Sequence, residues 1–217
     1  MATRAVSAAV ALIAVIAATD ACTSQRSHPE RSATPSRQSP AAARDTGDAS
    51  RLGRSYSMDG GTFRYPTAWR LSTYPLVTSF STLVAFLSNN PLHDPCVRAA
   101  GDISCSSPLS RLGPAGVLVT WAVVGFPGQG IDNVPGTHTT IDSRPARLVV
   151  KKPVAAATCG LIGASWEVDA TVAVSSLHGA GGLWEMTACL ANPGAATAVS
   201  SAIAVARSLR LTAPAPS

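Results

Sequence analysis

The chain of 217 residues has few charged and few aromatic side chains, and only two of its residues are lysine. Charged residues make up 13% of the chain and aromatic residues 5%, and the arginines are spread along it rather than clustered. A nucleic-acid-binding surface needs a basic stripe with interleaved aromatic side chains, and no segment provides one. The net charge of +5 therefore gives no reason to expect nucleic acid as a partner.

Sequence motifs for metal ions and phosphates are missing as well. There is no Cys-x-x-Cys pair and no two histidines stand at helical spacing, so we predict no metal site even at HDPC, residues 93–96. The glycine-rich stretch GFPGQG at 125–130 lacks the lysine and the following helix that a phosphate-binding loop needs. We expect the protein to hold no cofactor.

No Gly-x-Ser-x-Gly nucleophile elbow is present either. His93, His138 and His178 fall in predicted loops or turns, and serines and carboxylates such as Asp94 and Asp142 are available. A hydrolase would need a serine, a histidine and an acid that converge in space. We expect a non-catalytic binding or accessory module, and a hydrolase assembled from loops is the alternative.

The sequence lacks an apolar run long enough to cross a bilayer, which takes about 20 residues. The run AVSAAVALIAVIAA at 5–18 has 14 residues and follows Arg4. A positive residue before an apolar run of about 7 to 15 residues is typical of a secretory signal peptide. Small residues precede Cys22, so we predict a signal peptide at 1–21 and export of the remainder.

Cys22 is the odd cysteine of five, because the other four lie in the body of the chain and can pair. The residues before it resemble a bacterial lipobox, in which small residues precede a cysteine that is lipidated on cleavage. Ala21 matches that pattern, whereas Thr19 replaces the usual leucine and Asp20 the usual small neutral residue. We expect a lipid on Cys22 that anchors the protein to the outer face of the cell membrane, with soluble secretion as the alternative.

Composition divides the exported part into a tether and one domain. Residues 22–55 have almost no large apolar side chains, so they cannot bury enough surface to offset the entropy of ordering. Residues 56–213 are long enough for one domain with a real core, and 214–217 form a short tail. Period-two hydrophobicity predicts an irregular loop at 89–115 and strands within 61–72, 76–88, 116–126, 139–150, 165–174 and 182–190.

One helix is predicted near the end of the chain. Asn192 can cap it and Pro193 suits its first turn. Apolar residues then follow at helical spacing, namely Val199, Ala202, Ile203, Ala206 and Leu209. An antiparallel sheet with one face covered by this helix is an α+β fold.

The strand at 165–174 alternates between apolar and polar side chains. Glu167, Asp169 and Thr171 point to the face opposite the core, which we interpret as solvated rather than as an acid pair for catalysis. The four tryptophans lie in or at the ends of predicted strands, and we expect them in the core rather than on a sugar-binding surface: Trp69, Trp121, Trp166 and Trp184.

The four cysteines of the domain allow three pairings, and export permits disulfides. We favour Cys96–Cys105, which closes a small loop inside the longest irregular segment. The second bridge is then Cys159–Cys189, which joins the approach to one strand with the end of its hairpin partner. Loop entropy gives each bridge about 2.5 to 4 kcal/mol of stabilisation.

Several short segments, taken in their order along the chain, resemble uncharacterised exported proteins and lipoproteins of actinobacteria with a Mog1/PsbP-like fold. These segments are FRYPTAW (63–69), VTWAVVGFPG (119–128), IDSRPARL (141–148), WEMTACL (184–190) and ARSLRL (206–211). The resemblance implies an antiparallel sheet between helices, as in an α/β/α sandwich, and a binding or accessory role without a reaction. The expected partner is an envelope protein or ligand.

Overall fold

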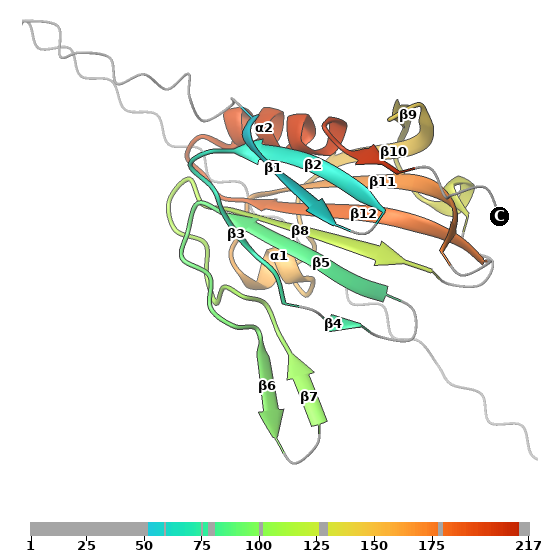
Figure 1. The fold of residues 1–217 in the computed structure, drawn as a ribbon. Coiled ribbons are helices and arrows are strands. Elements are labelled where there is room, and N and C mark those ends of the chain that lie inside the picture. The colour runs from blue at the N-terminus through green and yellow to red at the C-terminus, as the bar shows by residue number, and fades with distance from the viewer. Residues whose placement is uncertain are drawn as a thin grey trace, which may run out of the picture. The chain divides into compact units, whose positions relative to one another are not determined.

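An antiparallel sheet of eight strands forms the centre of the fold (Figure 1). The computed structural model describes residues 52–58, 60–74, 76–77, 81–99, 102–125, 130–177 and 180–212. The strands of the sheet are β3 Arg70–Ser72, β4 Leu76–Val77, β5 Ser81–Ser88, β8 Val117–Val124, β9 Thr137–Ile141, β10 Arg144–Lys151, β11 Trp166–Leu177 and β12 Ala180–Leu190. They run in the order β3-β5-β8-β12-β11-β10-β9, with β4 beside β5.

One face of this sheet is covered by helix α2 and by a second, small sheet (Figure 1). The covering elements are α2 Ala195–Arg207, β1 Leu52–Met58, β2 Gly61–Pro66 and β13 Arg210–Leu211. Phe63 of β2 stacks on Trp121 of β8 with ring centroids 5.3 Å apart, and Trp184 of β12 meets Trp121 edge-on. Trp69 is also buried, so three of the four tryptophans are core residues as expected, and Trp166 is partly buried against them.

The opposite face carries a smaller cluster of buried residues. The short helix α1, Thr158–Leu161, and the segment between β7 and β8 pack there on Phe86 and Leu118. Because both faces of β8 are covered, nearly every position of that strand is apolar, which explains the continuous hydrophobic run at 116–126. A 3₁₀ turn, η2 Ile131–Asn133, contributes further contacts to β10 and β11.

Antiparallel strands covered by one long helix confirm the predicted α+β class. On the second face, however, α1 has only four residues, so a helical layer there is short. The specific Mog1/PsbP-like assignment stays a prediction. The disordered tether at 22–55 also stays a prediction for most of its length. Its last residues are an exception, because β1 begins at Leu52 and pairs with β2.

Two local predictions were wrong. The segment 89–115 is not irregular throughout, because β6 Cys96–Ala99 and β7 Asp102–Cys105 form a hairpin that extends from the body of the fold (Figure 1). Helix α2 is not capped by Asn192, since it begins at Ala195 after Gly194, whose φ of 97° is left-handed and suits glycine. At the other end of the helix, Arg210 donates hydrogen bonds to the carbonyls of Arg207 and Leu209.

A tight turn at residues 142 and 143 joins β9 to β10. Asp142 and Ser143 have φ values of 51° and 61°, the pattern of a two-residue hairpin turn with both central residues left-handed. Aspartate tolerates that conformation well, and here Asp142 Oδ2 also accepts a 2.7 Å hydrogen bond from the Leu211 amide. The turn thereby ties the large sheet to β13.

Both disulfides form with the expected pairing. Cys96 is bonded to Cys105 across the β6–β7 hairpin, and Cys159 of α1 is bonded to Cys189 of β12. Bridges of this kind persist in oxidising compartments, so they indicate an extracytoplasmic location. Cys22 and the predicted signal peptide lie outside the described residues.

Candidate functional site

A cavity of about 600 Å³ lies on the sheet face that carries α1. Its floor consists of residues from three neighbouring strands whose side chains point to the same face, at alternate positions of β8 and β12 and on both sides of an irregularity in β5. These residues are Leu118, Thr120 and Ala122 of β8, Glu185, Thr187 and Cys189 of β12, and Ser81, Leu83 and Phe86 of β5. Their partners on the other face fill the main core.

The walls of the cavity come from the two segments that the disulfides hold. Thr158 and Leu161 of α1 form one wall, and Pro95 with the stretch 105–108 forms another. Each disulfide contributes one cysteine to the lining, Cys105 from one and Cys189 from the other. Leu161 is 71% exposed, so an apolar side chain stands at the rim. The cross-links therefore fix the shape of this cavity as well as the stability of the chain.

Glu185 is the one ionisable side chain in the lining, since both lining cysteines are in disulfides. Within the described residues its partly buried carboxylate has no hydrogen-bond or ion-pair partner. Burial raises the pKa of this carboxyl above its ordinary value of 4.5, and the negative charge of Asp169 raises it further. An unpaired carboxylate in a cavity is costly to keep ionised and can be stabilised by a bound donor or cation.

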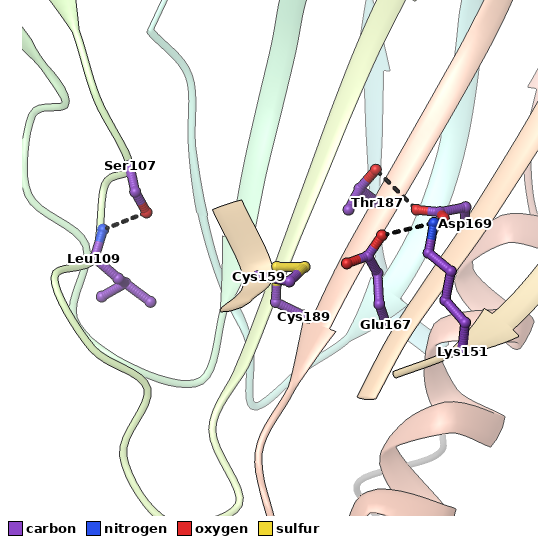
Figure 2. Close-up of a disulfide and its surroundings, with 8 residues drawn as sticks. All are labelled: Ser107, Leu109, Lys151, Cys159, Glu167, Asp169, Thr187 and Cys189. Atoms are coloured by element: carbon purple, nitrogen blue, oxygen red, sulfur yellow. Dashed lines mark hydrogen bonds and ion pairs between the residues drawn. A yellow bond between two sulfur atoms is a disulfide. The ribbon is translucent and has the colours of Figure 1, made fainter. Parts of the chain in front are cut away.

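A second polar group lies beside the cavity, on β10, β11 and β12 (Figure 2). Lys151 Nζ is 3.0 Å from Glu167 Oε1 and 2.7 Å from Asp169 Oδ2. Asp169 also accepts a 3.1 Å hydrogen bond from the hydroxyl of Thr187, which lines the cavity. The hydrogen bond to Asp169 raises the pKa of Lys151 above its ordinary value of 10.5; burial opposes this, and the hydrogen bond to Glu167 adds to it.

This arrangement corrects the prediction of a solvated face at Glu167 and Asp169. Only 7% of Glu167 is exposed, and it lies opposite Cys189, whose bridge to Cys159 holds α1 against the sheet. The two carboxylates share one lysine, so they form a structural ion-pair network. That network holds Asp169, which in turn makes the surroundings of Glu185 negative.

The other residues considered for catalysis do not converge in the described part of the chain. The rings of His93 and His138 have no hydrogen bond to a serine or a carboxylate among the residues described, and His178 lies outside them. Asp94 accepts a 2.9 Å hydrogen bond from the Cys96 amide, a turn contact at the base of the hairpin. Asp142 holds β13, as described above.

The described residues contain no group of three histidine, cysteine, aspartate or glutamate side chains that could hold a metal ion. Most of the stretch GFPGQG at 125–130 falls outside the description, as do Thr19 and Asp20 before the predicted cleavage site. Across the described ranges, none of the helices combines the length and the apolar character needed to cross a membrane.

Sequence reasoning did not single out Glu185 or the cavity. The available signal was the polar pair Glu185 and Thr187, at alternate positions of an otherwise apolar strand. Such a pair on an antiparallel strand is ordinarily read as a solvent-facing edge, because one face of such sheets commonly faces water.

No family model matches the chain, and no curated protein matches it in sequence. Among solved structures, it is similar to the 1.50 Å crystal structure of a protein from Bacteroides thetaiotaomicron VPI-5482, with a TM-score of 0.35 and 11% sequence identity. The match covers 75% of this chain and 49% of the other, so the chain spans about half the length of that neighbour. A similarity at this level assigns neither a family nor a function.

Proposed function

We propose that this protein is an exported cell-envelope protein, anchored by a lipid on Cys22, whose domain binds a small ligand in the cavity beside α1 without transforming it. The observation that carries the proposal is the unpaired Glu185 carboxylate in the floor of a cavity of about 600 Å³. Ligand sites typically measure about 300 to 1,000 Å³ and combine an apolar lining with a few placed polar groups. This lining has that character.

The hydroxyls in the walls favour binding over nucleophilic catalysis. Ser106 Oγ lies 3.5 Å from the carbonyl of Pro95 and donates to it, and Ser107 Oγ accepts a 3.3 Å hydrogen bond from the Leu109 amide (Figure 2). A serine nucleophile donates its proton to a base such as histidine, and neither hydroxyl has a hydrogen bond to a histidine ring among the described residues. These two hydroxyls shape the wall segment.

The cellular setting of the proposal follows from three features. Disulfides indicate an oxidising compartment, the first 21 residues have the pattern of a signal peptide, and Cys22 is the cysteine without a partner in the domain. The resemblance to actinobacterial exported proteins with a Mog1/PsbP-like fold supports the same role, because it implies a binding or accessory module displayed outside the membrane.

The cavity can be tested with N-phenyl-1-naphthylamine, a neutral dye that fluoresces in apolar surroundings. Titration into the oxidised exported chain, residues 22–217 purified without lipid, should give saturable binding of one dye per chain. Ala122→Trp places a large ring on the cavity floor and should abolish the signal. Ala196→Trp, on the exposed side of α2, is the matched control and should bind as the unmodified chain does.

Cooperative thermal unfolding of the Ala122→Trp variant, measured in parallel, shows that it is folded. Absence of saturable dye binding in the unmodified chain would refute the proposed function. Undiminished binding by folded Ala122→Trp would do the same, because the dye would then bind elsewhere.

A further inference from the structure

The cavity floor changes character along the strands. The register of β8 and β12 sets three pairs side by side, first Leu118 with Cys189, then Thr120 with Thr187, then Ala122 with Glu185. The first and last pairs are four residues apart along each strand, which corresponds to about 13 Å. The floor therefore runs from an apolar end, through two hydroxyls, to a carboxylate.

The apolar end is continuous with the smaller core. Leu118 and Phe86 belong to that core, and both also line the cavity. No lysine or arginine is among the residues that line the cavity, at either end. An anionic group would thus meet no positive partner anywhere along the floor.

Cationic side chains near Glu185 are already engaged. Lys151 contacts both Glu167 and Asp169, and the Arg147 guanidinium donates to the Ile131 carbonyl at 3.2 Å and lies 3.6 Å from Asp132. Glu185, by contrast, has no partner among the described residues. Three carboxyl groups, Glu167, Asp169 and Glu185, thus lie near a single lysine, Lys151, which contacts only the first two.

We infer that the cavity binds an elongated organic cation, an amine or ammonium compound whose apolar tail lies along Leu118 and Phe86 and whose charged group lies at Glu185. This inference rests on the proposed binding function and specifies its ligand class. An ammonium group at Glu185 would supply the ion pair that the folded chain leaves unmade, in surroundings where burial strengthens it. The apolar tail would gain the hydrophobic burial that the other end of the floor offers.

Three ligands with the same tail and different heads test the inference, namely octylammonium, octanoate and 1-octanol. Each is titrated against the chain, residues 22–217, with bound N-phenyl-1-naphthylamine, and its displacement of the dye is measured. We expect octylammonium to bind at least about tenfold more tightly than either of the others, since a charge-assisted contact is made by this head alone.

The Glu185→Gln variant should lose about tenfold in octylammonium affinity and keep its 1-octanol affinity. Asp132→Asn removes the same charge from a side chain that is 93% exposed and absent from the cavity lining, and it should leave both affinities within about twofold.

The failures of the two proposals are distinguishable. If the dye binds but octanoate or 1-octanol displaces it as well as octylammonium, the cationic ligand class is wrong and the binding cavity stands. The same conclusion follows if Glu185→Gln leaves the octylammonium affinity unchanged, or if octylammonium does not displace bound dye. If the dye itself does not bind, the proposed function fails and the inference fails with it.

Discussion

The bridge between Cys159 and Cys189 should contribute most of its stabilisation through the unfolded chain. The two residues are 30 positions apart, and loop-closure entropy for a ring of that size gives about 3.7 kcal/mol. Cys96 and Cys105 are only 9 positions apart, for which the same relation gives about 2.7 kcal/mol. The double variant Cys159→Ala/Cys189→Ala should therefore be less stable than Cys96→Ala/Cys105→Ala.

The structure adds two reasons for this order. Cys159 and Cys189 are 1% and 2% exposed, so their removal also leaves a packing defect in the smaller core. The β6–β7 hairpin forms a separate two-stranded sheet, so it can open locally without the rest of the fold. A local opening limits how much the short bridge contributes to global stability.

Urea titration, followed by tryptophan fluorescence, measures the free energy of unfolding that each double variant loses. The signal reports unfolding because Trp69, Trp121 and Trp184 are buried in the folded chain. With an m-value of about 2 kcal/mol/M, the midpoint of Cys159→Ala/Cys189→Ala should fall by roughly 2 M. Dye binding should weaken too, since α1 supplies Thr158 and Leu161 to the cavity wall and has no side-chain cap of its own.

A loss below about 1 kcal/mol would refute this reasoning, because the chain-entropy contribution would then be absent. A larger loss from Cys96→Ala/Cys105→Ala would refute it as well. The free energy of unfolding of each protein is calculated with its own m-value, because removing a bridge lets the unfolded chain expand and should raise m.

Three further changes test the charges and the anchor. Glu185→Gln should raise the Tm at neutral pH, because the raised pKa of Glu185 means that its ionised form destabilises the folded protein. This gain in Tm should vanish below the ordinary pKa of 4.5, where the glutamate is protonated in both the folded and the unfolded chain. Lys151→Met should lower the free energy of unfolding, measured by urea titration, by about 1 to 3 kcal/mol, because it leaves Glu167 and Asp169 without a cation. Because the pKa of Lys151 is raised, this loss of stability should persist up to pH 10.5 and decline only above it. The intact mass of the mature protein in the membrane fraction should exceed the mass of residues 22–217 by the mass of the attached lipid, and Cys22→Ser should abolish this difference. A mature protein whose mass equals that of unmodified residues 22–217 would contradict the lipid anchor.

The strands and their hairpins could be predicted because the information for them is local. Alternation along β11, a glycine-rich connection and the apolar positions of β12 together predict an antiparallel pair, and the structure pairs these strands over most of their length. The turn at Asp142 and Ser143 was equally accessible, because aspartate is tolerated at left-handed positions of such turns.

The cavity could not be predicted in the same way, because its parts are distant in sequence. The floor needs β5, β8 and β12 side by side, and the walls come from residues 105–108 and from α1. Strand order is a property of the whole sheet, and period-two patterns say nothing about it. A period-two pattern shows which side chains share a face of the sheet, but it does not show what covers that face. For this reason the sequence predicted a solvent-exposed Glu167, which is buried.

One combination of sequence features does carry part of this missing information. The predicted Cys159–Cys189 bridge requires the segment around Cys159 to lie against the face of β12 that Cys189 occupies, since disulfide-bonded residues have Cα atoms within about 7 Å. Glu185 and Thr187 stand four and two positions earlier on the same strand, so they share that face. A disulfide from β12 to an element outside the sheet thus predicts that the face with Glu185 and Thr187 is covered. A carboxylate on a covered face needs a hydrogen-bond donor or a cation as its partner. Lys151 is that partner for Glu167 and Asp169, whereas Glu185 has no partner among the described residues.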